Sequence, residues 1–172
     1  MADRYIALAE ESTFGSAGST FIYYKLLRET IETTRTDFFP ETTEHWTVPV
    51  KAEGYFRTTG DFDTVVEPIQ WPKLLVFFIG DPTTSQPGGA TETYQHVFKF
   101  GADETLSSTG IKPFTLKIGT GIENDRQIVG CVISQITLEA VNREIVGSTV
   151  SILGSGHETL QAAASPDWSA YT

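Results

Sequence analysis

Alternating apolar and polar residues predict half-buried β-strands at several places in the chain. In residues 94–100 the aromatic side chains share one face, and residues 114–118 repeat this pattern. Side chains two positions apart point to the same side of a strand, so we expect both faces to lie in the core. These faces are formed by Tyr94, Phe98 and Phe100 in the first strand and by Phe114, Leu116 and Ile118 in the second.

The longest predicted strand covers residues 128–141. Its first half is apolar on both faces, and its second half alternates between apolar and polar residues. Asn142-Arg143 then forms a turn signal before a further strand at 144–153. The pattern therefore predicts one long β-hairpin over residues 128–153.

Further strands are predicted in the first half of the chain. Residues 21–35 form an extended stretch rich in β-branched side chains, and residues 48–57 and 62–66 form two strands around a turn at 58–61. The glycine- and proline-rich segments predicted as loops are 83–93 and 119–125.

One segment, residues 72–79, has the signals of a helix. Pro72 fits the first helical position, Gly80 fits the left-handed cap, and the following Asp81-Pro82 prevents continuation. Because this helix is apolar nearly all round, we expect it to be covered on most sides. The predicted fold class is mainly β, a sandwich or barrel-like fold with one short helix and with long loop and terminal extensions.

The length of 172 residues fits a single domain. Within it we expect an N-terminal arm at 1–20, the β-sandwich at 21–156 and a C-terminal tail or linker at 157–172. The N-terminus lacks the basic start and long apolar centre of a signal peptide, and no apolar run is long enough to span a bilayer. We therefore expect synthesis in the cytoplasm and no membrane partner.

The charge balance argues against a protein that grips nucleic acid. Twelve Lys and Arg face 22 Asp and Glu, which gives a formal net charge of −10, whereas such binding replaces phosphate counterions with Lys and Arg. The one cysteine, Cys131, excludes an intrachain disulfide and a zinc site of paired thiolates. It lies in an apolar strand, so we interpret it as a small core residue.

No constellation of residues predicts catalysis, a cofactor or a metal site. The three histidines lie far apart, and no phosphate-binding loop or nucleophile elbow is present. Two acidic pairs, Asp61 with Asp63 and Glu123 with Asp125, are interpreted as solvated edges because their spacing is not specific. The histidines are His45, His96 and His157. We therefore expect that the protein is not an enzyme.

The segment 36–47 combines acids with aromatic residues, which is unusual for a plain solvent loop. Aromatic residues on a projecting polar loop favour a contact surface. The alternative is a loop that folds back on its own sandwich. The candidate contact residues are Asp37, Phe38, Phe39, Glu41, His45 and Trp46.

Several stretches together resemble the tail tube proteins of long-tailed (siphovirus-like) phages and related archaeal viruses. The resemblance covers most of residues 1–156 and consists of patterned hydrophobic residues and glycines. Many relatives continue well past this length, which leaves open whether 162–172 is a terminus or a linker. The stretches are Tyr5 to Gly15, Ala52 to Gly80, the strands at 94–98 and 114–116, and a closing hairpin from Gly130 to Gly154.

This resemblance implies a structural virion protein of the tail. Subunits would form hexameric rings by pairing their sheet edges, and the rings would stack into a tube that conducts the genome at infection. The segment 36–47 would then be an axial or lateral contact loop. The implied partners are further copies of the chain, other tail proteins such as the tape measure, tail terminator and distal tail proteins, and passing DNA that is not specifically bound.

On this view the acidity of the chain has a purpose, because a negative channel wall repels DNA. Candidate channel acids are Glu53, Glu139 and Glu144, although each could equally lie on the outer surface. A related alternative is the tube of a contractile injection or gene-transfer particle. An alternative from another class is a carbohydrate-binding β-sandwich that stacks sugars on exposed tryptophans, namely Trp46, Trp71 and Trp168.

Overall fold

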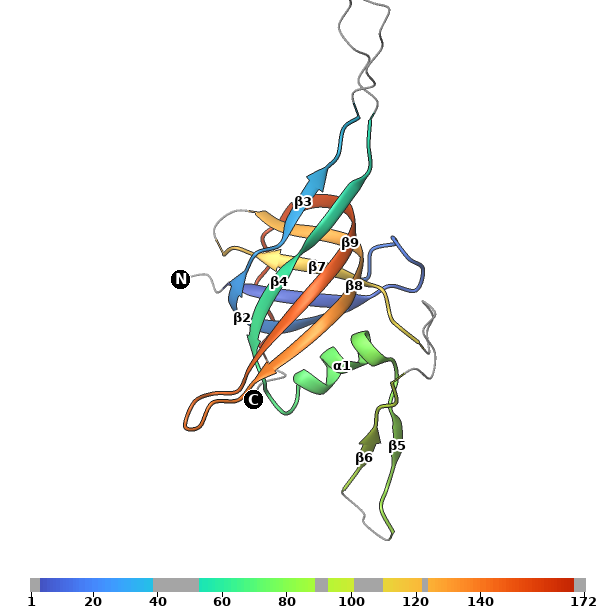
Figure 1. The fold of residues 1–172 in the computed structure, drawn as a ribbon, viewed down its shortest axis with the longest axis vertical. Coiled ribbons are helices and arrows are strands. Elements are labelled where there is room, and N and C mark those ends of the chain that lie inside the picture. The colour runs from blue at the N-terminus through green and yellow to red at the C-terminus, as the bar shows by residue number, and fades with distance from the viewer. Residues whose placement is uncertain (1–3, 39–52, 89–92, 101–109, 122–123, 169–172) are drawn as a thin grey trace, which may run out of the picture.

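The computed structural model describes residues 4–38, 53–88, 93–100, 110–121 and 124–168 (Figure 1). Over these residues the chain is mainly β with one short helix, as predicted. The strands are β1 (Tyr5–Glu10), β2 (Phe21–Glu29), β3 (Glu32–Arg35), β4 (Phe56–Val65), β5 (Thr83–Ser85), β6 (Gln95–Val97), β7 (Phe114–Gly119), β8 (Asn124–Glu139) and β9 (Gly147–Ala162), and the helix is α1 (Trp71–Ile79).

Seven strands form one antiparallel sheet in the order β2-β1-β7-β8-β9-β4-β3. Because β2 also pairs with β4, the sheet closes on itself, and the predicted sandwich or barrel-like fold takes the form of a barrel. Its interior holds the apolar residues of β7 as predicted, and α1 lies against the barrel (Figure 1). The largest fully buried side chains include Tyr5, Ile6, Leu8, Phe62, Leu74, Phe114, Leu116, Ile118, Ile128 and Ile152.

The first strand corrects the prediction of an N-terminal arm over residues 1–20. Residues 5–10 form β1, which pairs with β2 on one side and with β7 on the other. All five residues from Tyr5 to Ala9 are buried. A strand that is covered on both faces shows no alternation, so its short apolar run carries no strand period.

The predicted turn at 58–61 is wrong, because these residues lie inside the continuous strand β4. Gly60 has a φ of 145°, and a Cβ there would lie 2.4 Å from the carbonyl oxygen of Thr30. The glycine therefore allows the break between β2 and β3 to approach β4 closely, instead of turning the chain. The extended stretch predicted at 21–35 is present, interrupted at Thr30 and Ile31.

The long hairpin predicted at 128–153 is confirmed and extends further at both ends. β8 begins at Asn124, which pairs with Ala162 at the end of β9. Residues 157–162, predicted as part of a tail, therefore belong to the sheet. Their side chains are mostly exposed, so pairing with β8 rather than core burial keeps them extended.

The aromatic face predicted for residues 94–100 does not enter the core. β6 pairs with β5 in a separate two-stranded hairpin that projects beyond α1 (Figure 1). β5 lies within the segment 83–93 that was predicted as a loop. Tyr94 is 58% exposed and Phe100 is 76% exposed. Alternation indicates that a strand is amphipathic, but it does not show which surface covers the apolar side. A hairpin of two strands has no second layer of structure to bury that side.

The helix is confirmed, and Gly80 closes it by donating its N–H to the carbonyl of Val76. One face packs on the barrel through the buried Leu74 and Phe77, whose ring meets that of Phe114 edge to face at 5.4 Å. The remaining apolar residues of α1 are half-buried, so the expected cover on most sides is absent over the described residues.

We predict that Gly60→Ala destabilises the subunit by about 2 kcal/mol or more, because a Cβ would meet the backbone of Thr30 and Ile31. Chemical denaturation measures this loss. Gly147→Ala is the matched control, since a Cβ at this strand glycine meets nothing within 4 Å. Equal stability of the two variants would contradict the close-approach explanation.

Candidate assembly surfaces

Among the strand edges that lack a strand partner in the described residues, two lie at the ends of one row of strands, on β8 and on β3. β7 pairs with β8 only as far as Cys131, so the part of β8 from Val132 to Glu139 has a strand on one side only, β9. Ile111, which precedes β7, forms an isolated bridge. β3 pairs with β4 alone. Such edges present rows of unpaired N–H and C=O groups, which are templates for pairing with another chain. A β-bulge lies between Ile133 and Gln135, near the start of the free β8 edge.

The directions of these two edges match. The strands β3-β4-β9-β8 form a row in which each neighbouring pair is antiparallel. With four strands in the row, β3 and β8 run in opposite directions at its two ends. The free β8 edge of one copy can therefore pair antiparallel with the free β3 edge of another, and this contact can repeat from copy to copy.

One face of this row is polar. Cross-strand partners place Gln135, Ser151 and Asp61 side by side, and their neighbours in the alternation, Ile136, Val150 and Phe62, turn to the interior. The hydroxyl of Thr149 donates to the carboxylate of Asp63 at 2.7 Å on the polar side. We call this surface the polar face; it consists of Thr59, Asp61, Asp63, Gln135, Thr137, Glu139, Thr149 and Ser151. These eight side chains carry three carboxylates and no cation. Arg57, Val132 and Leu153 lie on the same side of the sheet, next to Thr59.

The three predicted channel acids lie in different surroundings. Glu139 belongs to the polar face, whereas Glu144 lies in the turn between β8 and β9. Glu53 precedes β4 and pairs with Arg35 at 2.9 Å. The structure thus separates these acids.

Two of the predicted contact-loop residues lie in the described part of the chain. Asp37 pairs with Arg35 at 2.9 Å, and Phe38 is 53% exposed. The hydrogen bond to Glu53, and the nearby Asp37, raise the pKa of Arg35 above its ordinary value. The four others, Phe39, Glu41, His45 and Trp46, lie outside the described residues.

Asp125 was predicted as part of a solvated acidic edge, and this prediction is wrong. It is 1% exposed and accepts hydrogen bonds from the Tyr5 hydroxyl at 2.6 Å and from the Ala164 N–H at 2.9 Å. Desolvation, together with this carboxylate, raises the pKa of Tyr5, which therefore stays protonated as the donor. One buried carboxylate thus joins the chain beyond β9 to the first strand of the barrel.

A second buried carboxylate, Glu11, orders the loop after β1. It accepts hydrogen bonds from the N–H groups of Gly15 and Gly130 and from the hydroxyl of Thr115, at 2.7 to 2.8 Å. Three donors compensate for the cost of burying its charge. The sequence did not reveal this residue, because its partners Thr115 and Gly130 are distant in sequence. Glu11 also belongs to no motif of recognisable spacing.

A bidentate ion pair closes the barrel near the start of β8. Arg126 donates to both oxygens of Glu158 at 2.7 and 3.1 Å, and to the carbonyl of Ile31 at 3.1 Å. These hydrogen bonds lower the pKa of Glu158. The stabilisation is therefore present above the ordinary carboxyl pKa and is lost as the pH falls through the lowered value.

A third ion cluster lies where α1 leads into the β5–β6 hairpin. The ammonium of Lys112 is 3.1 Å from Glu10 and 3.1 Å from Asp81. Burial alone would lower the pKa of Lys112, but its hydrogen bonds to the two carboxylates raise it above the ordinary value. This cluster fixes the base of the hairpin against β1.

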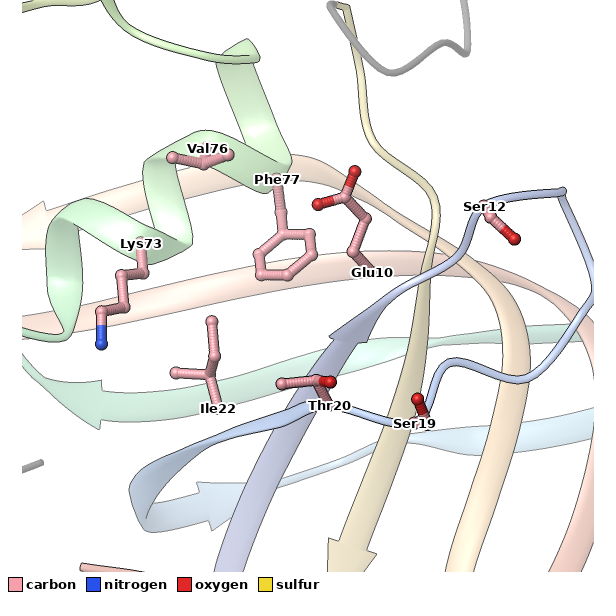
Figure 2. A pocket seen from close by; sticks show the side chains of 8 residues that line it. All are labelled: Glu10, Ser12, Ser19, Thr20, Ile22, Lys73, Val76 and Phe77. Atoms are coloured by element: carbon pink, nitrogen blue, oxygen red, sulfur yellow. The ribbon is translucent and has the colours of Figure 1, made fainter. Parts of the chain in front are cut away.

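Two surface grooves accompany these elements. The first, of about 480 Å³, lies between α1 and the strands β1 and β2, with Glu10 and Lys73 at its rim (Figure 2). The second, of about 390 Å³, lies where β7 leaves β8, and we call it the β8 groove. The β8 groove is lined by Phe14, Ile111, Gly130, Val132, Ile133, Leu153, Gly154 and Ser155.

The described residues offer no assembled reactive site. They contain no group of three His, Cys, Asp or Glu side chains placed to hold a metal ion. The helix they include is too short to cross a membrane.

Trp71 packs against the core and Trp168 lies on Tyr23, while Trp46 is outside the described residues. The described tryptophans therefore do not form a joint platform for sugars.

The profile of a family described as phage tail tube protein matches residues 1–172. The chain belongs to this family. It is a structural subunit of a tail tube and a component of the virion tail, as the sequence resemblance predicted. No curated protein matches the tail tube chain by sequence.

Solved structures with the same fold support the architecture. The tail of an empty gene transfer agent particle, with C6 symmetry, matches with a TM-score of 0.51 at 12% identity, covering 93% of this chain and 96% of that one. The SPP1 tail tube matches with a TM-score of 0.51 at 7% identity, covering 99% and 83%. The virion of a native gene transfer agent particle matches with a TM-score of 0.50 at 10% identity, covering 93% and 96%. These likenesses show that the fold is that of tail tubes.

We predict that Cys131 of the folded tail tube protein resists alkylation at pH 8. Burial raises the pKa of its thiol to about 12, so the reactive thiolate is scarce and the sulfur is covered. Mass spectrometry after iodoacetamide treatment should show labelling only in denaturant. Rapid labelling of the native protein would contradict the packing of β8.

Proposed function

We propose that this tail tube protein assembles into hexameric rings that stack into a tube, and that the tube conducts the viral genome at infection. The observation that carries the proposal is the pair of free, oppositely directed edges on β3 and β8. Pairing them joins the four-stranded rows of neighbouring copies into one continuous sheet. Closure into a ring pairs both of these edges in every copy, as in a β-barrel. The C6 symmetry of the gene transfer agent tail supports six copies in a ring.

The polar face is the surface that lines the proposed channel. The opposite side of the row is occupied by the core, since Ile136, Val150 and Phe62 turn into the barrel. The eight side chains of the polar face include carboxylates and no cation, so they offer phosphates no ion pairs and favour passage of DNA without retention. Of the predicted channel acids, Glu139 has this position.

Further contacts between copies, axial or lateral, are assigned to the segment that extends from β3 and β4. The strands β3 and β4 continue outward as a ribbon, in which Thr36 donates its N–H to the carbonyl of Tyr55 (Figure 1). The segment 36–47 is the proposed contact loop at the end of this ribbon. The other proposed partners are the tape measure, tail terminator and distal tail proteins, and synthesis takes place in the host cytoplasm. The gene transfer agent likeness keeps a gene-transfer particle as the related alternative.

The purified protein is expected to form rings or hollow tubes of uniform diameter as its concentration rises, which negative-stain microscopy measures. Ser134→Lys with Thr137→Lys should abolish assembly, because lysines on a strand edge oppose edge pairing. Thr83→Lys with Gln95→Lys, on the exposed β5–β6 hairpin, is the matched control. Thermal unfolding of each variant tests that the subunit still folds. A wild-type protein that stays monomeric at all concentrations would overturn the proposal.

The channel assignment predicts that tubes of Asp61→Lys with Ser151→Lys retain DNA. Both residues lie on the inner strands β4 and β9 and not on a free edge. These changes put cations on the polar face, and the retention should weaken as salt rises. Glu144→Lys, in the turn outside the polar face, should leave the retention of DNA by the tubes at the wild-type level. Co-sedimentation of tubes with short duplex DNA measures retention. Equal retention by both variants would place the channel wall elsewhere.

A further inference from the structure

The β8 groove lies at the end of a free strand edge. Its wall includes Val132 and Leu153, which are cross-strand partners, and it begins where the pairing of β7 with β8 stops at Cys131. Phe14 overhangs the groove with half of its side chain exposed. A strand that pairs antiparallel with the free part of β8 must run toward this groove, because β8 itself runs away from it.

The proposed neighbour presents an unburied aromatic residue at the matching end. β3 runs from Glu32 to Arg35, and the ribbon continues through Thr36 to Phe38. When β3 pairs with β8 of another copy, its C-terminal end points at the β8 groove. Phe38 is 53% exposed in its own subunit.

The side of the strand also agrees. Glu32 is the partner of Thr59 on the polar face, and Thr59 is in turn the partner of Leu153. Phe38 lies six residues after Glu32, and alternate residues share a face. Phe38 is therefore directed to the same side of the joined sheet as Leu153.

The charges permit this contact. The residues that line the β8 groove are uncharged, and so are those of β8 from Val132 to Leu138. On the incoming strand, Arg35 is already paired with Asp37 and Glu53 of its own copy, and Glu32 lies at the end of β3 that is remote from Phe38. The part of the strand next to Phe38 therefore brings no unpaired charge to the apolar groove.

We infer that the β8 groove is the socket for Phe38 of the neighbouring copy of this chain. The inference rests on the proposed function and deepens it, because it assigns a side-chain lock to an interface otherwise made of backbone hydrogen bonds. The backbone edge supplies attraction along its whole length. A single aromatic residue in a pocket fixes the register, since a slip by one residue turns Phe38 to the opposite face.

Disulfide crosslinking tests the contact directly. Phe38→Cys protein is mixed with Leu153→Cys protein under oxidising conditions, and we expect a crosslinked dimer of the two variants. Phe100→Cys, a more exposed aromatic position, replaces Phe38→Cys as the matched control and should not crosslink. The native Cys131 is buried and does not compete. Absence of the Phe38 crosslink, or an equal crosslink from position 100, overturns the inference.

Assembly gives a second readout. Phe38→Ala should raise the critical concentration for tubes by about tenfold or more, because each subunit loses a buried aromatic ring. Phe100→Ala should leave it unchanged, and both variants should keep the wild-type melting temperature. If the wild type forms tubes and Phe38→Ala forms them at the same critical concentration, the inference about Phe38 is overturned while the proposed function stands. A wild-type protein without tubes overturns the proposed function, while the crosslink between mixed variants still decides the contact.

Discussion

The edge of β4 that faces away from β9 is divided between two strands. β2 pairs with its second half, at Phe62 to Thr64, and β3 pairs with its first half, at Phe56 to Thr59. The β2 pairing closes the barrel and seals the core. The β3 pairing continues the same sheet outward as a ribbon. Gly60 lies where β2 gives way to β3. Because it has no side chain, the backbone between these two strands can approach β4 closely. A stable subunit and an extensible edge thus depend on one close backbone contact.

The sequence predicts the elements that alternate between apolar and polar residues or have clear signals at their ends. The strand β7 and the second half of β8 alternate, the helix has Pro72 and Gly80 at its ends, and each element is present. β1 was misread because both of its faces are covered, so that its residues do not alternate. Gly60 was misread as a turn because a glycine next to an acid gives the same local signal in a turn and in a strand under close approach.

Candidate surfaces were harder to predict than strands. Whether Tyr94 and Phe100 enter a core depends on which layer covers their strand, and this layer is set by the whole topology. Asp125 and Glu11 look like ordinary surface acids because their partners are distant in sequence. The free edges of β3 and β8 become visible only when every pairing in the sheet is known. The role as a structural subunit of a tail tube was predicted correctly from the resemblance of several stretches to that family.

The bulge between Ile133 and Gln135 also affects which partner the free edge of β8 can take. Two identical edges could pair about a two-fold axis, and the resulting dimer would be a dead end for a growing ring. A bulge adds local twist and leaves one residue outside the ladder, which disfavours pairing with a second edge that carries the same defect. The irregularity thus disfavours a symmetric dimer of two β8 edges and leaves the edge available for the β3 edge of the proposed neighbour.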